Sequence, residues 1–323
     1  MLSFSVKKLN LFLGLMTAAM LVFAHGCGDV SDTPVVDFSK TVAVARPGDH
    51  SPNSPLFRVA VAAMVSPQET FVYYHQILQY IATKLGRNVQ LIQRKTYGEI
   101  NELFGKGQID LAFICSGPYV AGREQYGFEA LAVPELWGSH VYQSYLIVNN
   151  DSSFYKLADL RGQVFAFTDP DSNTGRLVPT YWLAQMQERP ESFFGKTIYT
   201  YSHDNSILAV ARALVDGASV DGLIWEYYNK KNPTLTSRTR IIRKSEPYGI
   251  PPLVASASLA TELKERIREL VFSMHQTPEG QTILKELMID RFIAPKEEWY
   301  DPIRQMEKDL ARLEEKTCAP AEL

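Results

Sequence analysis

Cysteine is scarce in this sequence: the 323 residues include three, Cys27, Cys115 and Cys318. They form no C-x-x-C pair and no cluster with histidine at zinc-site spacing, so the sequence predicts neither a disulfide scaffold nor a bound metal. If Cys27 is modified, Cys115 and Cys318 remain. The sequence leaves open whether these two pair or stay free thiols.

Charge of one sign is not concentrated anywhere. The chain has 33 lysines and arginines against 36 aspartates and glutamates, a net charge of −3, and no basic block predicts a nucleic-acid-binding surface. The G-x-S-x-G elbow of serine hydrolases and the G-x-x-x-x-G-K loop of nucleotide-binding proteins are both absent. Ser172, His203 and Asp221 can be imagined as a catalytic triad, but the sequence favours a binding protein without a cofactor over an enzyme.

One long apolar run occurs, at residues 9–24, and two lysines precede it. It is shorter than the about 20 residues that span a bilayer, and its flanks are typical of a signal peptide. The following Ala24-His25-Gly26-Cys27 is similar to the lipobox of bacterial lipoproteins, although leucine is usual where Ala24 stands. We therefore expect a signal peptide over 1–26 and a lipid on Cys27. An ordinary signal peptide that leaves Cys27 as a free thiol is the alternative.

Residues 27–56 have the composition of a flexible tether, with four prolines among serine, aspartate, glycine and asparagine. A flexible segment of this length has a root-mean-square reach of roughly 30 Å. The expected protein is thus a membrane-anchored lipoprotein whose folded part faces the periplasm or the cell exterior.

From Phe57 onward, strand and helix patterns alternate, which is typical of a mainly parallel sheet flanked by helices. A longer strand at 141–148 and an extended segment at 245–251 are predicted to cross between two lobes. The sequence therefore predicts an α/β fold of two lobes, each a mixed sheet with flanking helices, joined by a two-strand hinge. The predicted lobes are 57–143 plus 248–323 for the first and 144–247 for the second.

Four loops carry small polar residues where a predicted strand ends and a helix begins. The carboxyl ends of strands face the ligand crevice in open α/β sheets, and a helix N-terminus binds anions through its unpaired N–H groups. Two loops from each lobe would enclose an oxyanion without lysine or arginine. The same residue types also serve simply as helix caps. The loops are Ser66-Pro67-Gln68, Ser116-Gly117-Pro118-Tyr119, Ser172-Asn173-Thr174-Gly175 and Ser202-His203-Asp204-Asn205.

Five side chains are individual candidates for the same cleft. His203, as a partly protonated donor, can contact an anionic oxygen. Tyr119, Tyr97 and Tyr73 suit the cleft wall, since all three are amphipathic. Glu226 follows a strand predicted at 220–224 and can accept a hydrogen bond from a protonated ligand group. Capping, packing or solvent exposure is the ordinary role of each.

Four sequence motifs point to one family. They resemble its DP-x-S-[ST]-[ST]-G loop, its SH-[DE] helix start, its VDAAAVD strand and its IDLAFxGPxxY strand and turn. The family is that of the phosphate/phosphite/phosphonate-binding proteins of ABC importers, a branch of the type II periplasmic binding proteins, and the resemblance covers about Phe57 to Met288. The matching segments are Asp169–Gly175, Tyr201–Asp204, Val220–Glu226, and Ile109–Phe113 with Gly117–Tyr119.

The resemblance implies that a small phosphorus oxyanion binds by cleft closure and is passed to an ABC permease and its ATPase. It implies that Ser172, Thr174 and His203 bind the phosphorus oxygens, with Asn173 between them. Ser116 and Tyr119 would line the pocket from the first lobe.

The chain departs from the family at two places. Asn173 stands where threonine is frequent, and Pro251 stands where some members have an acidic residue, which leaves Glu226 as the remaining acceptor. Two alternatives stay open: a sensory receptor of the same fold that signals to a membrane protein, and a binding protein for another small anion, for which Arg176 would hold a carboxylate.

Overall fold

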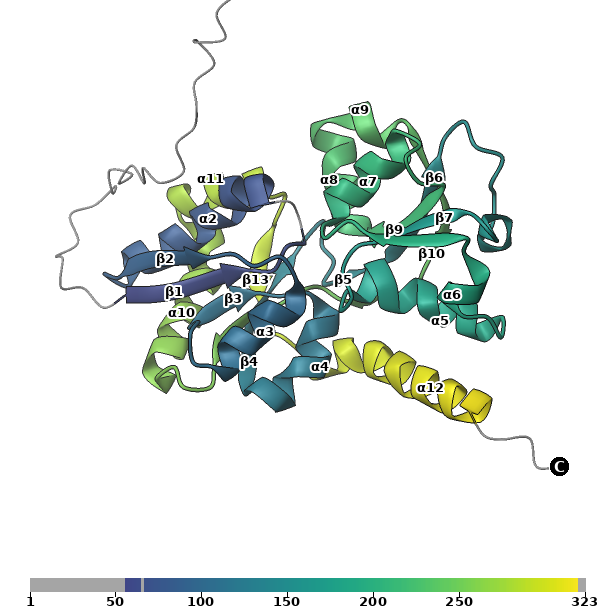
Figure 1. Ribbon diagram of the computed structural model, residues 1–323. Coiled ribbons are helices and arrows are strands. Elements are labelled where there is room, and N and C mark those ends of the chain that lie inside the picture. Colours follow the sequence, from purple (N-terminus) through teal and green to yellow (C-terminus); the bar gives the residue numbers. More distant parts are fainter. Residues whose placement is uncertain (1–55, 65–66, 319–323) are drawn as a thin grey trace, which may run out of the picture. The chain divides into compact units, whose positions relative to one another are not determined.

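The computed structural model describes residues 56–64 and 67–318 (Figure 1). The predicted signal peptide, Cys27 and the tether through residue 55 lie outside the described residues, as does Ser66 of the first predicted loop. Leu56, taken as the last tether residue, is instead the first residue of strand β1. Helix α2 begins at Pro67, as its sequence predicts. In the described part of the chain, no helix has the length and apolarity needed to cross a bilayer.

Six strands form one sheet in the spatial order β13-β4-β12-β3-β1-β2. β1 pairs in parallel with β2 and β3, because a helix carries the chain back after each strand. β12 runs antiparallel between β3 and β4, and β13 runs antiparallel to β4. The strands are β1 (Leu56–Val61), β2 (Asn88–Ile92), β3 (Leu111–Phe113), β4 (Phe128–Glu135), β12 (Leu253–Ser256) and β13 (Arg291–Ile293).

Side-chain alternation along these strands covers both faces of the sheet. Val59 and Phe113 pack with α2, α10 and α11, whereas Ala60 and Ala112 pack with α3 and α4. Figure 1 shows α2 and α11 on one face and α3 and α4 on the other. The helices are α2 (Pro67–Lys84), α3 (Tyr97–Gly105), α4 (Ser116–Tyr126), α10 (Thr261–Ser273), the 3₁₀ turn η4 (Met274–Gln276) and α11 (Pro278–Glu286).

Five strands form a second sheet in the order β10-β6-β9-β7-β8. β7 is parallel to β8 and β9, and β6 is antiparallel to β9 and β10. The strands are β6 (Ser144–Asn149), β7 (Val164–Phe167), β8 (Lys196–Tyr199), β9 (Gly217–Asp221) and β10 (Thr239–Lys244). The helical elements around them are η2 (Leu157–Leu160), η3 (Asn173–Leu177), α5 (Val178–Gln185), α6 (Pro190–Phe193), α7 (His203–Ala211), α8 (Gly222–Lys231) and α9 (Pro233–Thr236).

Two short strands connect the sheets. The chain leaves the six-stranded sheet through β5 (Val141–Tyr142) and returns through β11 (Tyr248–Gly249), and these two pair antiparallel. After β13, the turn η5 (Glu297–Tyr300) leads into α12 (Asp301–Cys318). α12 contacts α4, which belongs with the first sheet, and also η3 and α5, which belong with the second. The two sheets and their helices thus contact each other through more than the connecting strands.

Several elements of the structure differ from those that the sequence predicts. The strand predicted at 141–148 breaks at Gln143, because β5 pairs with β11 whereas β6 pairs with β9 and β10. The strand β4 was not predicted, and it includes Pro134, which lacks an N–H for sheet pairing. The strand predicted at 220–224 is wrong: β9 ends at Asp221, whose carboxylate accepts hydrogen bonds from the first N–H groups of α8. Glu226 therefore lies within a helix.

The two sheets direct the carboxyl ends of several strands toward each other. Beyond β1, the carbonyl of Met64 accepts a hydrogen bond from the backbone N–H of His203, at 3.0 Å. At the start of α3, the N–H of Tyr97 donates to Asp169 at 3.2 Å. At the start of α4, Gly117 lies so near the backbone after β7 that an added Cβ would stand 2.7 Å from the carbonyl oxygen of Asp171. The segments after five strands, β1, β2, β3, β7 and β8, thus meet in one place.

We expect Gly117→Ala to disfavour this contact. The new Cβ meets backbone atoms that cannot rotate away, and overpacking of this kind typically costs about 1–3 kcal/mol. Alanine is favourable within the helix α4 itself. The substitution therefore weakens only the contact between α4 and the backbone after β7. The expected result is a larger radius of gyration by small-angle X-ray scattering with an unchanged circular dichroism spectrum. Glu124→Ala, exposed on the same helix, is the control, and identical scattering from both variants would contradict the expectation.

Candidate functional site

The segment after β7 turns directly into a helical turn. The sequence predicts a loop over 169–175 and a helix from Leu177, but the turn η3 already begins at Asn173. Ser172 is its cap: its hydroxyl oxygen accepts from the N–H of Gly175 at 3.0 Å. A side chain at Gly175 would collide with Thr168, so this close turn requires glycine. Ser172 is therefore fully buried and already holds the backbone of the loop.

Asn173 and Thr174 are both fully buried. The carbonyl of Thr174 accepts from the hydroxyl of Ser144 at 2.7 Å, which fixes the backbone against β6. The amide nitrogen of Asn173 donates to the hydroxyl of Tyr142 at 3.2 Å. Thr174 Oγ1 and Asn173 Oδ1 have no hydrogen-bond partner in the protein. These two residues thus present one unpaired polar atom each.

His203 begins α7 behind its cap, Ser202. Its Nδ1 accepts from the backbone N–H of Asp221 at 3.0 Å and lies 3.1 Å from the hydroxyl of Thr168. Because Nδ1 accepts, the proton of the neutral ring is on Nε2, and Nε2 is buried without a partner. Burial lowers the pKa of His203 to about 3. The geometry and the lowered pKa therefore favour a neutral N–H donor at His203 over the partly protonated donor that the sequence suggested.

Ser116 and two tyrosines complete the group. The hydroxyl of Ser116 lies 2.5 Å from the hydroxyl of Tyr142, which also contacts Asn173. Tyr97 is fully buried at the start of α3, and its hydroxyl has no partner. The pKa of Tyr97 is raised by burial, and after that by the nearby Cys115, Asp169, Asp221 and Tyr142. Tyr142 escaped the sequence reasoning, since a tyrosine in a crossing strand carries no signal of its own.

Two predicted site residues are not brought to this group. Tyr119 is fully buried, its hydroxyl donates to Glu297 at 2.5 Å, and its ring lies 4.7 Å from that of Tyr300. Glu226 accepts from the hydroxyl of Tyr145 at 3.2 Å, on the second turn of α8. The displacement of Glu226 follows from the wrong strand boundary.

Asp221 takes the place at the end of β9 that was expected of Glu226. Its Oδ1 accepts from the N–H groups of Leu223 and Ile224, at 2.7 and 3.4 Å. Burial raises its pKa to about 7, against the opposing effect of these hydrogen bonds. Val220–Glu226 resembles the VDAAAVD strand motif. Residues 215–221 also read V-D-x-x-x-V-D, and this match, five residues earlier, ends at Asp221.

Cys115 is a buried free thiol at the N-cap position of α4. The backbone N–H groups of Asn173 and Gly117 point to it, but burial outweighs them and raises its pKa to about 11. The side chain of Cys318 lies outside the described residues.

The unpaired atoms gather in one place. Seven buried side-chain atoms in the described part of the chain lack a partner, and four of them are Tyr97 Oη, Asn173 Oδ1, Thr174 Oγ1 and His203 Nε2. Leaving a buried polar atom unpaired costs about 1–3 kcal/mol. Four such atoms at the meeting point of the strand ends therefore indicate a site that a polar ligand completes.

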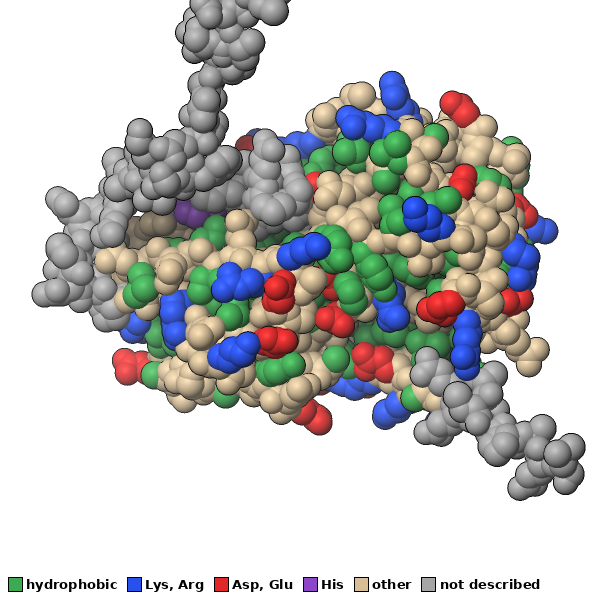
Figure 2. Space-filling view, in the orientation of Figure 1, with side chains coloured by type: hydrophobic (Ala, Val, Ile, Leu, Met, Phe, Trp, Pro, Cys, Tyr) green, Lys and Arg blue, Asp and Glu red, His purple; other side chains and the backbone are tan. Residues whose placement is uncertain are grey.

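Charges of both signs are mixed on the face of the molecule shown in Figure 2. The hydrogen-bond partners of the buried group are backbone N–H and C=O groups, hydroxyls, an amide side chain, a neutral imidazole and, at the N–H of Tyr97, the Asp169 carboxyl group. Neutral hydrogen-bond donors in a buried site can replace the water around an anion, even where no positively charged side chain is present.

Comparison with known proteins identifies the relatives of this chain. Residues 59–300 match the family model described as the periplasmic phosphonate substrate-binding protein of ABC transporters. The phosphonates-binding periplasmic protein of Escherichia coli is 27% identical over 234 residues, which are 71% of this chain and 69% of that one. The phosphate-import protein PhnD of Mycolicibacterium smegmatis is 25% identical over 210 residues, 61% of this chain and 65% of that one.

Solved structures agree on the fold. The binding protein of an ABC phosphonate transporter from Pseudomonas aeruginosa superimposes with a TM-score of 0.78 and 25% identity, over 83% of this chain and 90% of that one. PhnD1 of Prochlorococcus marinus, in complex with methylphosphonate, superimposes with a TM-score of 0.72 and 20% identity, over 79% and 98% of the two chains. The predicted type II periplasmic binding protein fold is confirmed.

The matched family consists of solute-binding proteins and not of enzymes. Its model spans well over half of the sequence. The chain therefore belongs to the family of periplasmic substrate-binding proteins of ABC phosphonate transporters.

Proposed function

We propose that this protein captures a small phosphorus oxyanion (phosphonate, phosphite or phosphate) and delivers it to an ABC permease and its ATPase. The observation that carries the proposal is the set of four buried, unpaired polar atoms on Tyr97, Asn173, Thr174 and His203. Three of these, a tyrosine hydroxyl, a threonine hydroxyl and the Nε2–H of a histidine, can donate to oxygens of one tetrahedral anion. Family membership supports this choice of ligand. The sensory-receptor alternative has no observation in its favour.

Asn173 fits the same role after rotation of its amide. As placed, its nitrogen donates to Tyr142 and its oxygen is unpaired. Rotation by 180° lets Tyr142 donate to the amide oxygen, since the Tyr142 hydroxyl can in turn accept from Ser116. The NH₂ group then faces the anion. In this role Ser116 acts through Tyr142, and Ser172 acts by holding the loop.

Asp221 supplies the acceptor of the proposed site. Its backbone N–H holds His203, and in this proposal its carboxyl group lies beside the anion. A carboxyl group whose pKa is about 7 shares a proton with a neighbouring phosphonate or phosphate oxygen, because two bare negative charges in one buried site repel each other. This proton replaces the positive side chain that the group lacks.

Binding is proposed to work by closure of two lobes, 57–143 plus 248–323 and 144–247. The two sheets and the strands β5 and β11 between them support this division. Ligand contacts from Tyr97 on one side and from Thr174 and His203 on the other favour the closed arrangement by their differential affinity. The lipid anchor on Cys27 and the tether over 27–55 would keep the protein beside its permease.

Removing one donor should weaken binding of every phosphorus oxyanion alike. We expect Thr174→Val and His203→Ala each to cost about 1–3 kcal/mol, roughly fivefold to 150-fold in Kd. Calorimetry with methylphosphonate, phosphite, phosphate and sulfate measures this, with Thr282→Val on the exposed side of α11 as the control. Unchanged affinities would mean that both residues are only structural. Binding of a carboxylate and of no phosphorus oxyanion would overturn the proposal.

The raised pKa of Asp221 predicts a pH-dependent stability. Between the ordinary value of 3.8 and about 7, the unfolded chain loses the proton that the folded chain keeps. The free energy of unfolding therefore falls as the pH rises through this window. His203, with its lowered pKa, contributes the opposite trend between about 3 and its ordinary 6.5.

Comparison with Asp221→Asn isolates the carboxyl group, since asparagine also caps helices. We expect the stability difference between variant and parent to grow in favour of the variant from pH 4.5 to pH 7 in urea titrations. A difference that stays constant across this range would refute the assignment.

The anchor is tested at Cys27. Cys27→Ser should move the exported protein from the membrane fraction to the soluble fraction and abolish labelling by radioactive palmitate, because the thiol carries the lipid. Cys318→Ser serves as the matched control and should behave like the parent. A parent protein that takes up no label would show that Cys27 is not lipidated.

A further inference from the structure

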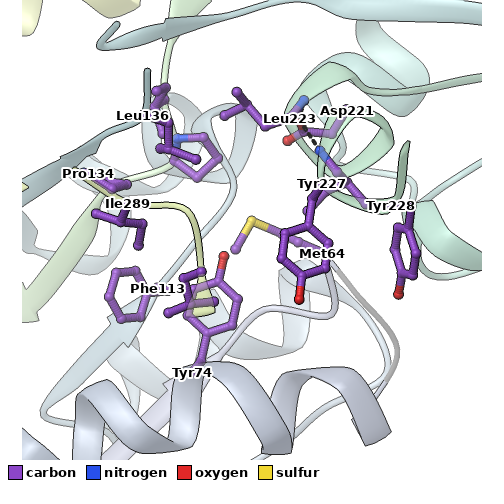
Figure 3. A pocket seen from close by; sticks show the side chains of 14 residues that line it. Met64, Tyr74, Phe113, Pro134, Leu136, Asp221, Leu223, Tyr227, Tyr228 and Ile289 are labelled. Atoms are coloured by element: carbon purple, nitrogen blue, oxygen red, sulfur yellow. Dashed lines mark hydrogen bonds between the residues drawn. The ribbon is translucent and has the colours of Figure 1, made fainter. Parts of the chain in front are cut away.

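A cavity of about 80 Å³ lies beside the proposed anion site (Figure 3). Residues beside the six-stranded sheet, residues beside the five-stranded sheet and the segment that follows β11 all contribute to its walls. Figure 3 shows Tyr74 rising from α2 toward Met64, opposite Asp221 and Leu223. The lining residues are Met64, Tyr74, Phe113, Pro134, Leu136, Asp221, Leu223, Ile224, Tyr227, Tyr228, Ile250, Pro251, Leu287 and Ile289.

The cavity begins where the anion site ends. Two of its lining residues hold His203 directly: the carbonyl of Met64 accepts from the His203 backbone, and the N–H of Asp221 donates to His203 Nδ1. Residues that line the cavity therefore contact His203 itself, and we take a group attached to the anion to extend into this cavity. The mechanism described above does not use this space.

The walls are mainly apolar. Among the lining residues that the structure describes, Asp221 carries an ionisable carboxyl group, Tyr74, Tyr227 and Tyr228 carry hydroxyl groups, and there is no lysine, arginine, histidine or glutamate. Both hydrogen bonds of the Asp221 side chain go to the start of α8, and its raised pKa reduces its charge at neutral pH. The rings of Tyr74 and Phe113 pack against each other, with centroids 5.0 Å apart. A buried ammonium group would lose its water here, and the Asp221 carboxyl group and the three tyrosine hydroxyls are the described groups that could accept from it in exchange.

The volume sets the length of the group. A cavity of about 150 Å³ holds one benzene ring of six carbon atoms, so a cavity of about 80 Å³ has room for about three carbon atoms. The hydrogen atom or hydroxyl group of phosphite or phosphate would leave it largely empty. A chain of two or three carbon atoms would occupy it, and apolar cavities bind apolar groups and exclude water.

We propose that the preferred ligand is an organophosphonate with a small apolar substituent, an alkyl or alkenyl group of about two or three carbons, which fills this cavity. The inference rests on the proposed function, since it takes the phosphorus oxyanion as the head group. Leu223, Pro251 and Ile289 would select the substituent through the shape and apolarity of the wall.

Calorimetry on the full chain at pH 7 tests this with a series of phosphite, methylphosphonate, ethylphosphonate and propylphosphonate. We expect affinity to rise about fourfold per added carbon, the factor that corresponds to burial of one CH₂ group. 2-Aminoethylphosphonate has the shape of propylphosphonate with an ammonium group in place of the terminal methyl. It should bind at least about tenfold more weakly, because its charge is buried against apolar walls.

Leu223→Trp fills the cavity without removing the backbone N–H that Asp221 caps. It should abolish the gain with chain length and leave phosphite affinity within about twofold of the parent. Leu214→Trp, on an exposed leucine, is the matched control and should retain the gain.

The outcomes separate the two proposals. Equal affinities across the series, or a preference for the aminoethyl compound, would overturn the inference while binding of phosphite leaves the proposed function intact. Absence of binding to the whole series would overturn the proposed function itself. Because the series is measured on the parent, the test stands even if Leu223→Trp does not fold.

Discussion

The hydrogen bond from the backbone N–H of Asp221 to Nδ1 of His203 is the contact on which the site depends. A backbone amide can only donate, so the imidazole must accept at Nδ1 and carry its proton on Nε2. The ring is buried, and its charged form is therefore unfavourable. Donation at Nε2 is thus set by the end of a strand and does not depend on solution pH near neutrality.

The same bond links the chemistry to the fold. Asp221 closes β9 and caps α8, and His203 opens α7 and bonds through its backbone to Met64 beyond β1. Any change in how the two sheets meet therefore moves the imidazole relative to Tyr97 and Thr174. Since these side chains come from different sheets, four unpaired atoms assemble in one place only when the parts are in contact. This arrangement is what cleft closure around an anion requires.

Selectivity in such a site arises from two regions with opposite properties. The head-group region consists of neutral donors and a carboxyl group with a raised pKa, which suits an anion that retains a proton. The adjoining cavity is apolar, which suits a substituent that has no charge. Asp221 lies at the boundary between the two regions, so the end of a single strand contributes to both.

The sequence by itself determined the class of fold and most of the head-group residues. Alternating strand and helix patterns are local, and so are the loop at 172–175 and the Ser202-His203 helix start, so a single sequence predicts them. Ser116, Ser172, Asn173, Thr174 and His203 all lie in the buried group or support it, although their binding role stays a prediction.

Only the tertiary structure decided which residues complete the group. Tyr97 and Tyr142 enter through contacts between segments far apart in the chain, and Asp221 replaces Glu226 because its own side chain ends the strand. Tyr119 turns away, since Glu297 from the C-terminal segment receives its hydroxyl. The protonation of His203 and the apolar cavity depend on burial. Burial is a property of packed segments, and no local pattern in the sequence contains it.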